Sequence, residues 1–305
     1  MGMRKRLRVR VALVGMAVAV AGVVALPNAS GAATSNATPR IVGGGPVGKT
    51  QFPSLAALMI PGKGHPRERL VCSGTVVAPD VILSAGHCMF PILFGLAMQG
   101  QTGSRDLGDK AATVASVTSV VLNKTWWFGS QSDDLALFKL SAPVPVPVSP
   151  LASKADRGLT VNGNQVQITG WGLTIPLAVF QPPPFDALPP RRAQVATVPI
   201  VGDDICQADY ADLDPTIFVP ATDLCAGQEG KDACYGDSGG PMYATDPSGG
   251  LKQIGVVSRG AGCATKSFPG IWTDVTALRP WIDKNVSNPC HKSLDPALAI
   301  QIYVC

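Results

Sequence analysis

The sequence is poor in histidine, in charged residues and in aromatic residues. Among 305 residues there are three His, 15% charged residues and 6% aromatic residues. The scarcity of histidine leaves few candidates for a general base that works near neutral pH. The eight cysteines contain no two close CxxC pairs, so a structural zinc site is not expected. With 46% hydrophobic residues, the chain can still bury one large core or two small ones.

A signal for export occupies the N-terminus. Residues 1–10 carry five positive charges, residues 11–26 form an apolar run, and small residues follow. This pattern is typical of a secretory signal peptide, which we place at residues 1–33 with cleavage near Ala32 or Ala33. A membrane anchor is the alternative, but sixteen residues fall short of the roughly 20 that a transmembrane helix needs.

The net charge changes sign when this segment is removed. Residues 1–40 contain six of the 25 Lys and Arg residues and none of the 21 acids, so the remainder has a net charge of −2 instead of +4. No basic field is left for nucleic acid. We therefore expect a secreted, extracellular protein with no nucleic-acid partner and no membrane contact after signal cleavage. Its eight cysteines all lie beyond residue 71, and we expect them in disulfides.

Short β-branched runs separated by Gly, Pro, Asn and Ser predict an all-β protein. These runs cover residues 54–60, 74–86, 112–122, 135–140, 166–171, 193–201, 253–258 and 270–275. The alternating prolines of residues 141–158 predict an extended connector between two halves of similar size. A second proline-rich segment, residues 173–192, predicts a long surface loop, and residues 277–286 predict the one long helix.

One serine lies in an unusual setting, the segment KDACYGDSGGP at residues 231–241. A serine hydroxyl becomes a good nucleophile only when a base removes its proton. Of the three histidines, His65 is in a polar loop and His291 is in the tail, whereas His87 lies between an apolar strand and a cysteine. A histidine base needs a carboxylate to orient it. We choose Asp134 over Asp133, because Asp134 directly precedes the apolar run LALFKL.

These motifs resemble the chymotrypsin–trypsin family of serine peptidases. The resemblance is carried by GDSGGP with a cysteine two residues upstream, by SAGHC, by DLALFKL, by RIVGG at residues 40–44, and by the order His, Asp, Ser. It covers residues 41–289. It implies an all-β fold of two six-stranded antiparallel Greek-key β-barrels with a short C-terminal helix, an inter-barrel connector at about 141–158 and an active site between the barrels. Residues 290–305 form a C-terminal extension.

The resemblance also implies a role for each motif. Asp134 orients His87, and His87 deprotonates the nucleophile Ser238. The backbone N–H groups of Gly236 and Ser238 form the oxyanion hole. The resemblance implies no metal and no cofactor.

An activation site follows from the same likeness. Residues 34–40 are an activation propeptide, and cleavage after Arg40 frees the amine of Ile41. That ammonium then pairs with Asp237, which makes the uncut chain a zymogen.

The implied primary pocket has Asp232 at its base and the small residues Gly260 and Gly270 in its walls. A carboxylate there selects Arg or Lys before the scissile bond. Ser258 matches the serine that hydrogen-bonds the triad aspartate. Arg259 departs from the pattern, because the family usually has tryptophan there. It is expected to weaken an apolar subsite and favour acidic groups, or to reach Asp232 and obstruct the pocket.

The family pattern implies three disulfides, Cys72–Cys88, Cys206–Cys225 and Cys234–Cys263. Cys290 and Cys305 remain and are predicted to pair with each other, an intermolecular bond being the alternative.

The expected partners are protein or peptide substrates with Arg or Lys before the cleaved bond, and protein protease inhibitors. The enzyme is expected to be a monomer. Two other functions stay open: a catalytically inactive or weakly active binding protein on the same scaffold, and a non-enzymatic adhesin or toxin.

Overall fold

The computed structural model describes residues 41–127, 131–290, 293–295 and 298–305. The predicted signal peptide at 1–33, the predicted propeptide at 34–40 with Arg40, and His291 lie outside the described residues. Within the described part, no helix combines the length and the apolar character needed to span a membrane.

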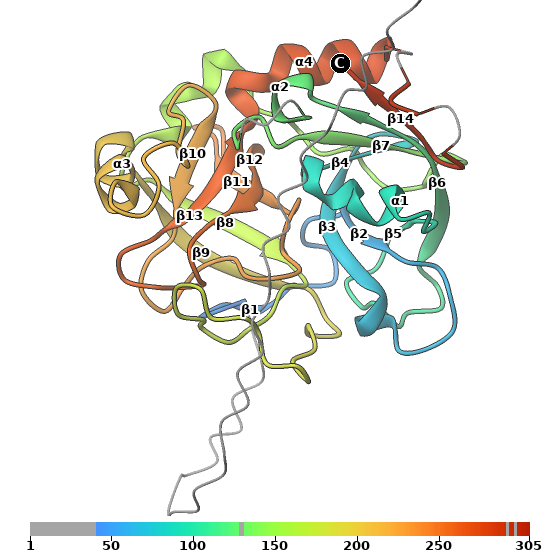
Figure 1. The fold of residues 1–305 in the computed structure, drawn as a ribbon, viewed down its shortest axis with the longest axis horizontal. Coiled ribbons are helices and arrows are strands. Elements are labelled where there is room, and N and C mark those ends of the chain that lie inside the picture. Colours follow the sequence, from blue (N-terminus) through green and yellow to red (C-terminus); the bar gives the residue numbers. More distant parts are fainter. Residues whose placement is uncertain (1–40, 128–130, 291–292, 296–297) are drawn as a thin grey trace, which may run out of the picture. The chain divides into compact units, whose positions relative to one another are not determined.

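Six antiparallel strands close the first barrel, in the order β2-β3-β4-β7-β6-β5 and back to β2 (Figure 1). The strands are β2 Leu55–Met59, β3 Leu70–Ala78, β4 Val81–Ser84, β5 Gln99–Thr102, β6 Thr113–Leu122 and β7 Ala136–Leu140. Each of these six strands therefore has a neighbour on both sides.

Six further antiparallel strands close the second barrel, in the order β8-β9-β10-β13-β12-β11 and back to β8. They are β8 Gln165–Gly170, β9 Gln194–Val201, β10 Asp223–Ala226, β11 Pro241–Thr245, β12 Leu251–Arg259 and β13 Gly270–Asp274. The short strand β1, Gly45–Pro46, pairs with β9. The predicted fold class, two six-stranded antiparallel barrels, is confirmed.

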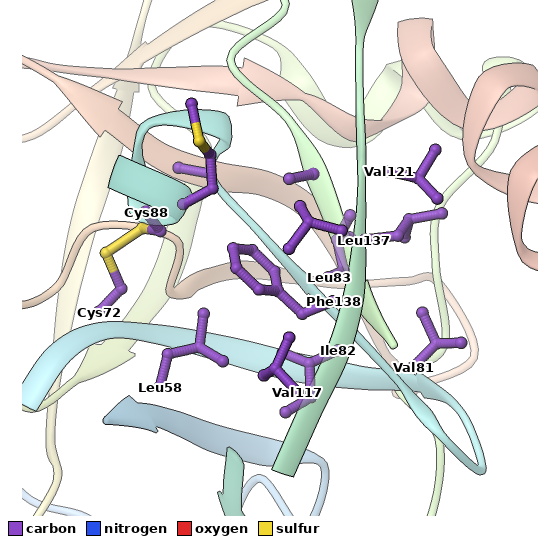
Figure 2. Packing of buried hydrophobic residues seen from close by; sticks show 14 of the residues in the cluster. Leu58, Cys72, Val81, Ile82, Leu83, Cys88, Val117, Val121, Leu137 and Phe138 are labelled. Carbon is purple, nitrogen blue, oxygen red and sulfur yellow. A yellow bond between two sulfur atoms is a disulfide. The ribbon is translucent and has the colours of Figure 1, made fainter. Parts of the chain in front are cut away.

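Each barrel has an apolar interior. Along β9, buried residues alternate with less buried ones, as expected for a strand with one face in the core. In the first barrel, the ring of Phe138 on β7 lies close to Leu58 of β2 and Ile82 of β4 (Figure 2). Burial of a side chain of this size contributes about 1.5–3 kcal/mol.

β2 is buried on both faces because it also packs against the second barrel. Ala56 and Leu58 point into the first core, whereas Leu55, Ala57 and Met59 join a separate cluster. That cluster also contains two large side chains of the second barrel's half of the chain, Trp171 and Tyr243. The two barrels therefore share an apolar contact that β2 provides on the side of the first barrel.

The C-terminal helix α4, Val275–Ser287, packs onto the first barrel through Leu278 and Ile282. It begins two residues before the predicted range because Asp274 caps it, accepting the backbone N–H of Thr276 at 2.7 Å. Sequence analysis did not predict the helix α3, Asp203–Tyr210. The other helices are η1 Pro66–Arg69, η2 Gly86–Met89, α1 Phe90–Leu93, α2 Lys124–Trp127 and η3 Lys154–Thr160.

The C-terminal extension adds a strand to the first barrel. β14, Gln301–Val304, runs parallel to β6 and pairs with residues 119–122 (Figure 1). Ile302 is fully buried there, and Trp281 Nε1 of α4 donates to the carbonyl of Cys305 at 3.1 Å. Cys290 and Cys305 are joined by a disulfide, so the tail is tied to the end of α4.

Candidate active site

The strand register of the first barrel brings His87 and Asp134 together. His87 follows β4 in the short helix η2, and Asp134 precedes β7. β4 and β7 are neighbours with Ser84 opposite Ala136, so the residues just beyond these positions lie side by side. The Cys72–Cys88 disulfide ties the residue after His87 to β3.

Asp134 makes a dense set of hydrogen bonds. Its Oδ1 accepts the backbone N–H of His87 at 2.9 Å, and its Oδ2 lies 2.7 Å from His87 Nδ1. The Ser258 hydroxyl donates to the same Oδ2 at 2.7 Å. Burial alone would raise the pKa of Asp134, but the His87 charge and these hydrogen bonds lower it below its ordinary value. The carboxylate is therefore held ionised.

The electrostatics of His87 are set by opposing effects. Burial lowers its pKa, the Asp134 charge and hydrogen bond raise it, and the Arg259 charge lowers it. The balance places the pKa of His87 above its ordinary value of 6.5. An imidazole in this environment can accept a proton in the neutral to alkaline range.

Ser238 lies in a loop held by barrel-to-barrel hydrogen bonds. The backbone N–H of Ser73 donates to the Ser238 carbonyl at 2.8 Å, and the Ser73 hydroxyl donates to the Gly236 carbonyl at 3.0 Å. Gly236 has φ +98°, a conformation that favours glycine. At Gly239, a Cβ would lie 1.9 Å from Ser84 Oγ, so the loop has no room for a side chain at that turn.

His87 and Ser238 line the same cavity, of about 650 Å³. Among the described residues, the hydrogen-bond partner of the His87 ring is Asp134, and a bond between His87 and the nucleophile often forms only when substrate binds. Within the described residues, neither the backbone N–H of Gly236 nor that of Ser238 donates a hydrogen bond. Both residues line this cavity, so two backbone donors are available to a bound group.

A second cavity, of about 180 Å³, also reaches Ser238 and has Asp232 in its wall. Asp232 is 2% exposed and accepts the backbone N–H groups of Ala233 at 2.8 Å and Ala264 at 3.3 Å. Burial raises the pKa of Asp232 to about 8. Gly260 and Gly270 line the same cavity, and a Cβ on Gly270 would lie 2.8 Å from Asp232 Oδ1.

Asp237 is a second buried acid in this loop. It is 1% exposed and accepts the backbone N–H groups of Gly172 at 2.7 Å and Cys234 at 3.0 Å. Burial raises the pKa of Asp237 to about 7. Ile41 is also buried, in the core of the second barrel, and the next residue, Val42, forms an antiparallel bridge with Asp232.

Arg259 does not enter the Asp232 cavity as an ion-pair partner. Its guanidinium pairs with Asp223 on β10 and donates to the carbonyl of Ile217 from Nε at 2.9 Å. Its Nη1 donates to Ser258 Oγ at 3.0 Å. The predicted contact between Arg259 and Asp232 is therefore wrong, because the buried carboxylate of Asp223 binds the guanidinium instead.

The structure adds residues that sequence analysis missed. Ser73 holds the Ser238 loop, and Asp223 is the partner of Arg259. Trp126 lines the cavity of His87, and a Cβ on Gly86 would lie 2.9 Å from its ring. Glycine at position 86 of the motif SAGHC therefore leaves room for the Trp126 ring.

The eight cysteines form four disulfides, Cys72–Cys88, Cys206–Cys225, Cys234–Cys263 and Cys290–Cys305. Among the described residues, the one metal-like group of side chains is Cys72, His87 and Cys88. Its two cysteines are joined to each other, so they offer no thiolate to a metal ion.

Comparison with known proteins agrees with this geometry. A family model described as Trypsin matches residues 41–282. A "Trypsin-like protease" of Streptomyces glaucescens is 32% identical over 274 residues, which is 88% of this chain and 92% of the relative. "Trypsin zeta" of Drosophila erecta is 31% identical over 261 residues, 80% of this chain and 84% of the relative. "Trypsin-1" of Astacus astacus is 31% identical over 222 residues, 70% of this chain and 87% of the relative. The chain therefore belongs to the trypsin family and is a serine-type endopeptidase.

Proposed function

We propose that this chain is a secreted zymogen which, after cleavage between Arg40 and Ile41, hydrolyses peptide bonds that follow Arg or Lys. The observation that carries the specificity is the buried carboxylate of Asp232 in a cavity that opens at Ser238. Among the described residues, its hydrogen-bond donors are backbone N–H groups alone. A substrate cation would supply the missing charge.

The proposed reaction begins with attack of Ser238 Oγ on the substrate carbonyl carbon. His87 Nε2 accepts the serine proton, and Asp134 stabilises the imidazolium that forms. The free N–H groups of Gly236 and Ser238 donate to the developing oxyanion, each contributing roughly 3–4 kcal/mol to transition-state stabilisation. His87 then protonates the leaving amine, and water, deprotonated by His87, hydrolyses the acyl-enzyme.

The activation step is supported by Asp237. Its buried carboxylate has a raised pKa and accepts two backbone N–H groups. A freed ammonium at Ile41 would be an ionic partner for it, and such pairing would favour the charged form of Asp237. The bridge between Val42 and Asp232 already holds the segment after the cleavage site beside the pocket loop.

The test is to cleave the purified chain after Arg40 and assay matched peptides that end in Arg, Lys, Phe or Ala. We expect kcat/KM for Arg and Lys to exceed the value for Phe and Ala by at least about a hundredfold. Ser238→Ala should show no burst with an active-site titrant. Equal or better cleavage after Phe or Ala would contradict the role of Asp232. Absence of hydrolysis and of a burst in the wild type would favour the binding-protein alternative.

A further inference from the structure

Arg259 at the end of β12 and Asp223 on β10 form an ion pair next to the candidate triad. The Arg259 side chain is 15% exposed and that of Asp223 is fully buried. The carboxylate also accepts the backbone N–H of Val219 at 2.9 Å. An apolar residue at position 259 would leave Asp223 buried without a cation, which is costly. The two residues therefore depend on each other.

This ion pair is connected to the triad by an unbroken series of hydrogen bonds. Arg259 Nη1 donates to Ser258 Oγ at 3.0 Å, and Ser258 Oγ donates to Asp134 Oδ2 at 2.7 Å. The same Oδ2 lies 2.7 Å from His87 Nδ1. A serine hydroxyl has one proton, so a donor on its lone pair directs that proton toward Asp134. Arg259 thereby orients Ser258.

We propose that Arg259 is a positioning residue of the triad: through its hydrogen bond to Ser258 it orients the Asp134 carboxylate, and it places a positive charge at the cavity that His87 lines. The proposal rests on the proposed function, because it assigns an influence on the same three catalytic side chains. It gives the arginine at this position a role in the proton transfer, separate from any contact with substrate.

The charges around Arg259 support this reading. His87 faces Asp134 and Arg259, which have opposite effects on its pKa. Asp223 faces Arg259 and Asp133, and Tyr210 also interacts with Arg259. Burial raises the pKa of Asp223 to about 6, against the opposing effect of Arg259. Above that pH the ion pair is intact, in the range where His87 must be neutral to act as a base.

The test compares Arg259→Gln and Arg259→Lys with the wild type after activation at Arg40. The parameters kcat and KM are measured from pH 5 to pH 10 on one Arg peptide. For Arg259→Gln we expect kcat to fall by about threefold to tenfold with little change in KM. We also expect the acid limb of kcat, which reports His87 in the enzyme–substrate complex, to move to higher pH, because a charge that lowers the pKa of His87 is gone.

Arg259→Lys separates charge from geometry. Lysine keeps the positive charge but cannot reach Ser258, Asp223 and the Ile217 carbonyl with one planar group. The acid limb should stay near its wild-type position while kcat falls. Arg191→Gln is the matched control, since it breaks an arginine–aspartate pair, with Asp106 at 2.6 Å, whose arginine is exposed. Its activity and pH profile should match the wild type.

If Arg259→Gln fails to fold, the double variant Asp223→Asn with Arg259→Gln replaces it, because this variant removes the buried carboxylate of Asp223 together with its cation. It should keep both the loss of kcat and the moved acid limb. A wild-type kcat and an unmoved acid limb in Arg259→Gln, or in the double variant, would overturn the proposal. Failure of the wild type to show Ser238-dependent hydrolysis would instead overturn the proposed function.

Discussion

Asp134 and Asp232 are both buried carboxylates, but the two halves of the molecule surround them differently. Asp134, just before β7 in the first barrel, accepts two hydrogen bonds from His87 and one from Ser258, and its pKa is lowered. Asp232, in a loop of the second barrel, accepts backbone N–H groups, and its pKa is raised to about 8. Burial disfavours the charge in both cases, so the partners decide the outcome.

The two sites differ in whether the folded chain itself supplies a cationic partner for the buried carboxylate. Asp134 already has its cationic partner within the fold, because His87 can carry a positive charge 2.7 Å away. Asp232 and Asp237 have no such partner among the described residues. In the proposed mechanism, a substrate cation supplies it for Asp232 and the freed amine of Ile41 supplies it for Asp237.

The largest expected effect comes from Asp134→Asn. Because an amide cannot accept both His87 hydrogen bonds in the same way, the imidazole loses its orientation and its charge partner. We expect kcat on an Arg peptide to fall by about ten-thousandfold. Asp133→Asn, at the neighbouring acid, is the control and should keep kcat within about threefold of the wild type. Comparable losses in the two variants would remove the distinction that assigns the role to Asp134.

The same chemical change at Asp232 should alter specificity. For Asp232→Asn we expect kcat/KM on an Arg peptide to fall by about a thousandfold, because the substrate cation loses its counter-charge. A matched peptide with Leu before the scissile bond should be cleaved at least as well as by the wild type. Equal losses on both peptides would indicate that Asp232 supports the loop of Ser238 and does not bind the substrate cation.

The pH profile of the activated wild type sharpens the comparison. Since the pKa of His87 is raised, the acid limb of kcat/KM should lie above pH 6.5 for any substrate. An Arg peptide also needs ionised Asp232, so its kcat/KM should keep rising to about pH 8. Where both groups titrate, the slope should approach a hundredfold per pH unit, against tenfold for the Leu peptide. Profiles that coincide would mean that Asp232 is ionised throughout this range.

The smallest effect concerns the stability of the uncut chain. Folding raises the pKa of Asp232 from its ordinary 3.8 to about 8, so the folded state binds that proton more tightly. The stabilisation is complete below pH 3.8 and is lost as the pH rises through about 8. In a Ser238→Ala background, Asp232→Asn should therefore raise Tm more at pH 9 than at pH 5. A Tm difference that does not depend on pH would show that Asp232 titrates normally.

Much of the fold could be predicted because its signals are local. The eight β-branched runs fall on nine of the twelve barrel strands, because residues 74–86 span both β3 and β4. The segment 141–150 lacks a strand, as its prolines predict. Other elements depended on distant contacts. β14 forms a strand because it pairs with β6, which lies more than 170 residues earlier in the sequence. The helix α3 is polar in sequence and buries only Cys206 and Tyr210.

The residues of the candidate site also divide into those that local sequence predicts and those that depend on distant contacts. The residues of the motifs, His87, Asp134 and Ser238, could be named from their neighbours in sequence. The partner of Arg259 could not, because Asp223 lies 36 positions away on a strand separated from β12 by β13. Trp126 was missed for the same reason, because it lies 40 positions after Gly86, the residue beside its ring.

The sequence by itself determined which chemical groups are present, where the strands form, and which family the motifs indicate. These properties are carried by side-chain type and by patterns over a few residues. Only the tertiary structure decided which buried carboxylate has a cation beside it, where Arg259 points, and which backbone N–H groups stay free. The reason is that proton affinity and hydrogen bonding depend on burial and on neighbours within a few ångströms, and folding chooses those neighbours from distant parts of the chain.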